Sequence, residues 1–99
     1  MSITSELTDN DDTLVINIDG RFDFSVHTPF RNAYRNQPDK KTYNINLEKV
    51  KHIDSAAFGM LLLLREFVGE DKCLRLLNPQ PTVKRSLEIA MFDQLFEVR

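Results

Sequence analysis

The chain has 99 residues, of which 41% are hydrophobic and 28% are charged. A chain of this length can bury one modest core, so we expect a single domain over residues 1–99 and no large enzyme with a separate substrate domain. Its 13 Lys and Arg residues against 15 Asp and Glu residues give a formal net charge of −2. No run of like charges is longer than Lys40–Lys41 or Asp11–Asp12, so the sequence lacks the basic footprint expected for nucleic-acid binding.

Alternating apolar and polar residues predict four strands. The first is a short edge strand whose free edge could pair with another chain. A polar turn at residues 8–12 connects it to the second strand, which we expect to end at Gly20. The four segments are Ile3–Leu7, Leu14–Asp19, Tyr43–Leu47 and about Lys72–Leu77.

Helical spacing predicts a first helix between the second and third strands. Pro29 is best tolerated at the first position of a helix, which favours Thr28 over Ser25 as the N-cap. The residues that share one face of this helix are Val26, Phe30, Ala33, Tyr34 and Gln37.

The second helix has the clearest pattern. We expect Asp54 or Ser55 to cap it and Gly69 to end it. Leu62 and Leu63 point away from its main apolar stripe, which predicts a helix buried on more than one side. The stripe comprises Ala57, Met60, Leu61, Leu64, Phe67 and Val68.

A third helix is predicted after the segment Asn78–Pro81, and an apolar tail of Phe92, Leu95 and Phe96 is expected to pack on the sheet. Strands that alternate with helices indicate an α/β domain with parallel pairing. We expect a mixed sheet of four to five strands covered by three to four helices. The apolar face of the third helix comprises Val83, Leu87, Ala90 and Met91.

The sequence offers little for metal, cofactor or membrane chemistry. Cys73 is the single cysteine, and His27 and His52 lack the spacing of zinc ligands. No glycine-rich loop could hold a nucleotide phosphate, so we expect no cofactor. The longest apolar run, Met60–Leu64, is too short to span a membrane, and the N-terminus does not resemble a signal peptide. We therefore expect a cytoplasmic protein.

The start of the second helix is the one segment that resembles a functional site. Asp54 and Ser55 lie at a helix N-terminus, where the helix dipole favours added negative charge such as a phosphate. The small residues Ala56, Ala57 and Gly59 would let another surface approach the backbone closely. The simpler alternative is that the carboxylate and hydroxyl are only helix caps.

Catalysis is poorly supported by the same residues. A Ser–His–Asp arrangement would need His27 or His52 to meet Ser55 in the fold. Asp23 and Asp54 could form an acid–base pair, but Asp23 is more simply a loop or capping carboxylate. We therefore expect a protein that is not an enzyme.

Several motifs together resemble the STAS family, whose single-domain bacterial members are anti-sigma factor antagonists. The resemblance covers about residues 3–98 and implies the α/β fold of that family. The matching segments are Gly20-Arg21-Phe22-Asp23 before the first helix, Ile45–Leu47 as a central strand, Asp54-Ser55 with Gly59 and the leucine-rich helix, and Pro81–Arg85 at the last helix.

The resemblance implies that Ser55 is a phosphorylation site. Ala56 replaces the second serine of the family pattern Asp-Ser-Ser-Gly-Leu-Gly and Ala57 its first glycine, whereas Gly59 is retained. The partner-binding residues that it implies are Asp23, Asp54, Ser55, Ala56, Gly59 and Met60.

The implied partners are an anti-sigma factor, which in this family can itself be the serine kinase, and a metal-dependent serine phosphatase. The chain is similar to a branch in which a response regulator is the phosphatase. Phosphorylation of Ser55 would release the anti-sigma factor. Two alternatives stay open: an unphosphorylated adaptor subunit of a lipid-transport or scaffold complex, and a small-ligand or nucleotide-binding domain.

Overall fold

The computed structural model describes residues 3–99, which form one mixed sheet with helices. The sheet has five strands in the order β1-β2-β3-β4-β5; β1 is antiparallel to β2, and the other neighbours are parallel. The predicted α/β class is confirmed. In chain order the elements are β1 (Ile3–Thr8), β2 (Thr13–Phe22), α1 (His27–Arg35), β3 (Thr42–Ile53), α2 (Ser55–Val68), β4 (Cys73–Leu77), α3 (Pro81–Ile89) and β5 (Glu97–Val98).

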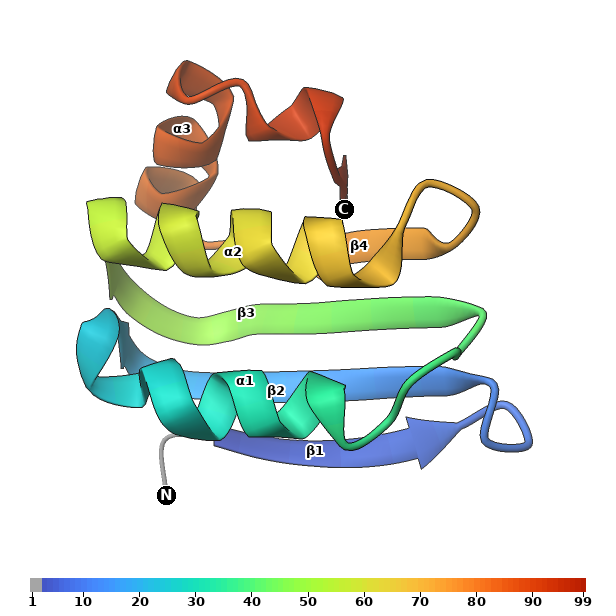
Figure 1. The fold of residues 1–99 in the computed structure, drawn as a ribbon. Helices are drawn as coiled ribbons and strands as arrows, with labels where there is room; N and C mark the ends of the chain where they lie inside the picture. Colours follow the sequence, from blue (N-terminus) through green and yellow to red (C-terminus); the bar gives the residue numbers. More distant parts are fainter. Residues whose placement is uncertain (1–2) are drawn as a thin grey trace.

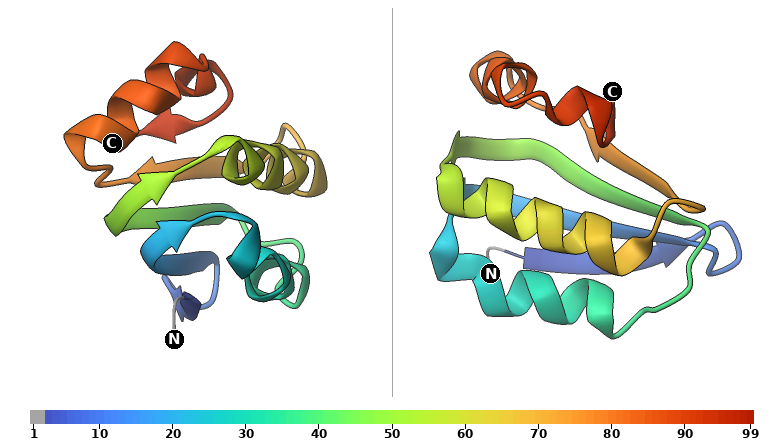
Figure 2. Two further views of the ribbon diagram at one scale, coloured as in Figure 1. Left: turned by 90° about the vertical axis from the view of Figure 1, so that its left-hand side faces the viewer. Right: turned by 45° about the horizontal axis from the view of Figure 1, so that its top comes forward.

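The parallel strands place both long connections on one face of the sheet. Helices α1 and α2 lie side by side there, each following a strand and running back along the sheet (Figure 1). Helix α3 and the C-terminal segment lie beyond β4, at the edge away from β1 (Figure 2). As a result, α1 and α2 both begin at the carboxyl ends of the parallel strands β2 and β3.

The core confirms the predicted alternation in the strands. Apolar residues of the three central strands are almost fully buried between the sheet and the helices, and burying each such side chain contributes about 1.5–3 kcal/mol. The strand residues of this core include Leu14, Ile16, Ile18, Tyr43, Ile45, Leu47, Leu74 and Leu76.

The prediction that Gly20 ends the second strand is wrong. β2 continues to Phe22, which is fully buried, and its pairing with β3 shifts register on either side of Gly20. Gly20 has a φ of +94°, a value that other residues rarely adopt. The glycine therefore marks an irregularity within the strand, which carries the chain on to Asp23.

The predicted caps of the first helix are also wrong. Helix α1 begins at His27, and a short 3-10 turn, η1 (Phe24–Val26), precedes it. Asp23 is the N-cap of this turn. The N-cap of α1 is Val26, which makes no side-chain capping hydrogen bond, so neither Ser25 nor Thr28 caps the helix. Helix α1 ends at Arg35, before Gln37.

Helix α2 has the predicted ends but not the predicted burial. Asp54 is its N-cap and Gly69 its C-cap. Leu62 and Leu63, which we expected to be buried, are 45% and 52% exposed. The helix therefore buries one stripe and leaves an apolar face in solvent.

The C-terminal part differs from the prediction after Ile89. Ala90 and Met91 are exposed and lie beyond α3 because Met91 adopts a left-handed conformation with φ +62°. The following turn η2 (Phe92–Gln94) leads into β5, a fifth strand that pairs with β4. Phe92 and Phe96 are buried as expected, whereas Leu95 is exposed.

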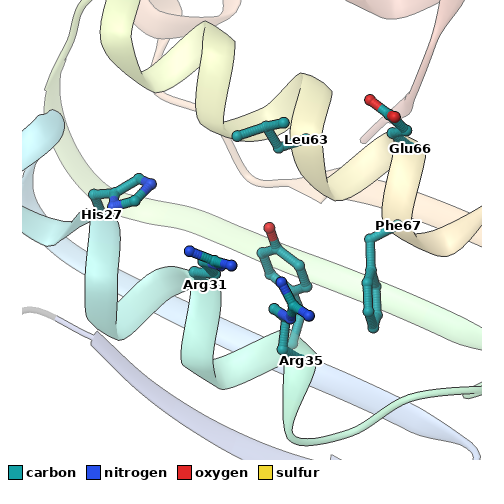
Figure 3. Close-up of a pocket in the computed structure, with 7 residues that line it drawn as sticks. His27, Arg31, Arg35, Leu63, Glu66 and Phe67 are labelled. Carbon is teal, nitrogen blue, oxygen red and sulfur yellow. The ribbon is translucent and has the colours of Figure 1, made fainter.

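A groove of about 470 Å³ remains between α1 and α2 (Figure 3). Its lining residues are His27, Arg31, Tyr34, Arg35, Leu63, Glu66 and Phe67. Within residues 3–99, no helix is long and apolar enough to cross a membrane.

Candidate functional site

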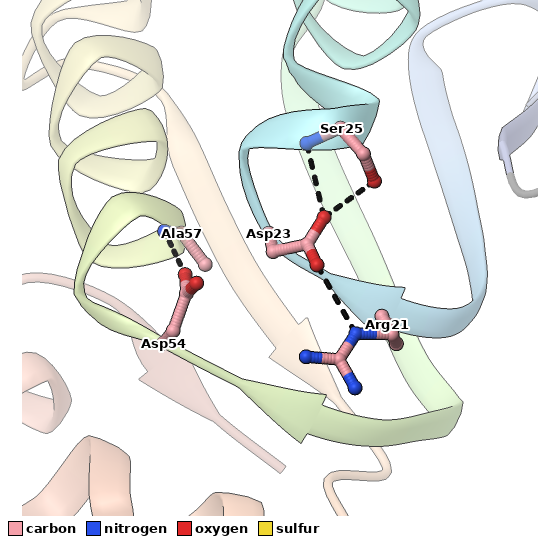
Figure 4. A network of polar contacts seen from close by, with 5 residues as sticks. All are labelled: Arg21, Asp23, Ser25, Asp54 and Ala57. Carbon is pink, nitrogen blue, oxygen red and sulfur yellow. Dashed lines mark hydrogen bonds and ion pairs between the residues drawn. The ribbon is translucent and has the colours of Figure 1, made fainter.

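The candidate site forms where β2 and β3 end together. Phe22 and Ile53 are register partners in these parallel strands. The next residues along the chain, Asp23 and Asp54, therefore lie together at the carboxyl ends of these strands, and each begins a helical segment (Figure 4). The local sequence thus places two carboxylates and two helix N-termini together.

Asp54 caps the N-terminus of α2. Its extended backbone lets the Oδ1 atom accept a hydrogen bond from the amide of Ala57 at 3.1 Å. This arrangement satisfies one of the amides that a helix leaves unpaired. Ser55, the first residue of the helix, is exposed. Its hydroxyl is thus accessible at the positive end of the helix dipole.

Asp23 caps the turn η1 in the same way that Asp54 caps α2. Its carboxylate accepts hydrogen bonds from the Ser25 amide at 3.0 Å and the Ser25 hydroxyl at 2.5 Å, and pairs with Arg21 Nε at 3.2 Å. The hydrogen bond from the Ser25 side chain, followed by that from Arg21, lowers the pKa of Asp23 below its ordinary value of 3.8. Both aspartates thus have the contacts of capping carboxylates, and Asp23 stays ionised at neutral pH.

The structure places most of the predicted binding residues at the carboxyl ends of β2 and β3 or on the first turns of α2. Ser55 and Gly59 are exposed at four-residue spacing, which places them on one face of α2. Asp54 and Ala56 are half-buried beside them. Met60 is the exception, because its side chain is only 4% exposed and belongs to the core. We therefore remove Met60 from the predicted contact surface.

The exposed face of α2 continues past Gly59 into residues that the sequence analysis assigned to the core. Leu62 and Leu63 follow at three- and four-residue spacing, and both are exposed. We refer to Ser55, Gly59, Leu62 and Leu63 as the α2 face. The two exposed leucines thus extend the exposed face of α2 beyond Gly59 with apolar side chains. Their position off the main apolar stripe was the sequence signal for this surface.

The described residues include no obvious metal centre. Across residues 3–99, no group of three or more His, Cys, Asp or Glu side chains is placed to hold a metal ion. His27 stacks on Phe24 with 4.9 Å between the ring centroids, and Cys73 is half-buried in β4. The chemical groups at the site are a hydroxyl, two carboxylates and exposed apolar side chains.

The structure is a small α/β domain with an exposed serine at a helix N-terminus. The model of the STAS domain matches residues 4–99, and the chain belongs to this family. A STAS-domain containing protein of Pseudomonas aeruginosa is 41% identical over an alignment of 100 positions, which covers 99% of this chain and 99% of that protein.

Solved structures confirm the STAS fold and include anti-sigma factor antagonists. A protein of Thermotoga maritima described in this way matches with a TM-score of 0.83 at 15% identity, over 97% of this chain and 84% of that chain. The phosphorylated form of SpoIIAA, a Bacillus cell fate determinant, matches with a TM-score of 0.67 at 21% identity, over 98% and 90%. At these identities the likeness concerns the fold.

Proposed function

We propose that this chain is an anti-sigma factor antagonist controlled by phosphorylation of Ser55. In the unmodified form, the α2 face and the neighbouring loop at Asp23 bind an anti-sigma factor, which then releases its sigma factor. Phosphorylated Ser55 ends this binding. The observation that carries the proposal is the exposed Ser55 hydroxyl at the head of an exposed, leucine-bearing face of α2.

The position of Ser55 explains how a phosphate could act without unfolding the domain. A phosphoserine carries about 1.5–2 negative charges at neutral pH. At the first residue of α2 the helix dipole and unpaired amides stabilise this charge. Against an apolar partner surface, however, burying it costs several kcal/mol. Since about 1.4 kcal/mol changes an affinity tenfold, the phosphate would weaken binding by orders of magnitude.

The comparisons support the proposal in two respects. Anti-sigma factor antagonists are among the structural neighbours, and SpoIIAA has been described in both phosphorylated and unphosphorylated forms. In this proposal the chain is a substrate and a binding protein, not an enzyme. A serine kinase, which can be the anti-sigma factor itself, adds the phosphate, and a serine phosphatase, in this branch a response regulator, removes it. The chain acts in the cytoplasm without nucleic acid or membrane contacts.

The proposal is tested by binding of purified anti-sigma factors from the same genome. Ser55→Ala should bind one of them as tightly as the unmodified wild type, whereas Ser55→Asp should bind at least about tenfold more weakly. Ser5→Asp, at an exposed site on β1, is the control for an added charge. Equal affinities of the Ala and Asp variants at Ser55 would refute the switch. Copurification with a membrane permease would favour the adaptor alternative.

A further inference from the structure

Two rows of side chains with different chemistry line the groove between α1 and α2. On α1, His27, Arg31 and Arg35 occur at four-residue spacing and therefore share one helix face. On α2, Leu63 and Phe67 have the same spacing, and the Phe67 ring points toward α1 (Figure 3). A basic row of about 12 Å thus runs beside an apolar row of about 6 Å, at 1.5 Å per helical residue.

Among residues 3–99, no acidic side chain forms an ion pair with the two arginines of the basic row. Helix α1 contains no acidic residue, and Glu66 on α2 directs its carboxylate away from α1 (Figure 3). The groove is therefore a cationic surface on a chain whose net charge is −2. Within residues 3–99, the ion pairs are made by Arg21, Lys41, Lys72, Arg75 and Arg99.

The apolar row is open to solvent along its length. Leu63 is 52% exposed and Phe67 39%, and the ring of Phe67 packs on Tyr34 at 5.1 Å between centroids. Beside the groove, at the start of α1, Phe24 is 68% exposed and stacks on His27. The groove thus offers contacts to aliphatic side chains and to carboxylates at once.

We propose that this groove receives a short amphipathic helix of the anti-sigma factor, in which Asp or Glu residues line one side of a row of aliphatic residues. The four-residue spacing of both walls matches the spacing of side chains on such a helix. The carboxylates pair with Arg31 and Arg35, and the aliphatic residues pack on Leu63 and Phe67. This inference rests on the proposed function, because it names the chemistry of the same partner.

An acidic occupant also connects the groove to Ser55. Helices α1 and α2 both begin at the carboxyl ends of β2 and β3, where Phe22 and Ile53 pair, so the end of the groove at His27 is the end nearer Ser55. Leu63, the first groove residue on α2, lies about 12 Å along the helix from Ser55. A phosphate on Ser55 adds negative charge at this end and repels the carboxylates of the incoming helix. Phosphorylation therefore acts on the groove contact as well as on the α2 face.

The test compares two exposed basic pairs by charge reversal. Arg31→Glu/Arg35→Glu changes the groove, and Lys84→Glu/Arg85→Glu changes α3 as a control. The ligand is the purified anti-sigma factor that binds the wild type, titrated calorimetrically at low and moderate salt. We expect the groove variant to bind at least about tenfold more weakly and to lose most of the salt dependence. The α3 variant should stay within about twofold of the wild type.

The apolar row is tested in the same assay. Phe67→Ser, at a 39% exposed position that lines the groove but is not part of the α2 face, should weaken binding, whereas Ile89→Ser, at a 73% exposed position on α3, should not. Circular dichroism would confirm that each variant folds. If the wild type binds and the groove variants bind equally well, the inference is wrong while the proposed function stands. If the wild type binds no anti-sigma factor of its genome, the proposed function fails, and this inference with it.

Discussion

Asp23 and Asp54 are equivalent residues of neighbouring parallel strands. Each directly follows one member of the register pair Phe22 and Ile53, and each caps the helical segment that begins there. The pairing of β2 with β3 thus fixes where two helix N-termini start. The same pairing places Ser55 at the carboxyl ends of the two strands. The caps and the proposed switch therefore depend on one structural feature, the pairing of β2 with β3.

Loss of the Asp54 cap should destabilise the domain by a modest amount. Asp54→Ala removes the acceptor for the Ala57 amide and should cost about 1 kcal/mol, whereas Asp54→Asn keeps a side-chain acceptor and should cost less. Urea unfolding monitored by circular dichroism measures both changes. An alanine variant as stable as the wild type would show that the cap contributes nothing.

The carboxyl of Asp23 should titrate below its ordinary pKa of 3.8. Ser25→Ala should raise this pKa more than Arg21→Ala, because the hydrogen bond from Ser25 is the larger cause of the shift. A depressed pKa means that ionised Asp23 stabilises the fold above pH 3.8, and that this contribution is lost as the pH falls further. The carboxyl carbon shift against pH, followed by NMR, measures the pKa. An unchanged value in Ser25→Ala would contradict the assignment.

Gly59→Ala should separate stability from binding. Gly59 lies within α2, and a Cβ there would meet nothing within 4 Å, so alanine should stabilise the domain by about 0.5–1 kcal/mol. The same methyl group would project from the α2 face and weaken binding of the anti-sigma factor. Thermal unfolding and calorimetric titration measure the two effects. Unchanged affinity would place Gly59 outside the contact.

Gly69→Ala is the matched control for this substitution. Gly69 ends α2 with φ +86° and ψ 178°, a conformation that is nearly restricted to glycine. Alanine should therefore destabilise the domain by about 1–3 kcal/mol. A stabilising effect at both glycines would mean that helix propensity alone decides the outcome.

The C-terminal segment should contribute strongly to stability through Phe96. Phe96 is 3% exposed and stacks on Phe92, so Phe96→Ala should cost about 3–5 kcal/mol. Leu95→Ala, at a 42% exposed neighbour, should change the free energy of unfolding by no more than about 0.5 kcal/mol. Chemical denaturation of the two variants measures the difference. Similar effects would indicate that the segment is not packed as the structure shows.

The sequence predicted those features that depend on local patterns. The alternation in β2, β3 and β4 and the bounds of α2 arise from short-range periodicity and from residues such as Asp54 and Gly69, whose capping preferences are strong. Ser55 was located for the same reason, because a carboxylate and a hydroxyl before an apolar helix define its N-terminus.

Other features depend on contacts between distant segments. β5 has only two residues, and backbone hydrogen bonds hold the chain end beside β4: the Asn78 amide donates to the Arg99 carbonyl, and the Arg99 amide donates to the Leu76 carbonyl. No local sequence pattern indicates such contacts. Gly20 suggested an end to β2, but pairing with β3 carries the strand through an irregularity. Leu62 and Leu63 illustrate a further limit, because hydrophobicity alone does not distinguish a core residue from one that is exposed to solvent.

The most direct measurement is phosphopeptide mapping of the chain isolated from its native cells, with and without its serine phosphatase. The account predicts one phosphate per chain on Ser55, more abundant when the phosphatase is absent. Ser55 that stays unmodified in both conditions, or a phosphate confined to another residue, would contradict the claim that Ser55 is the switch.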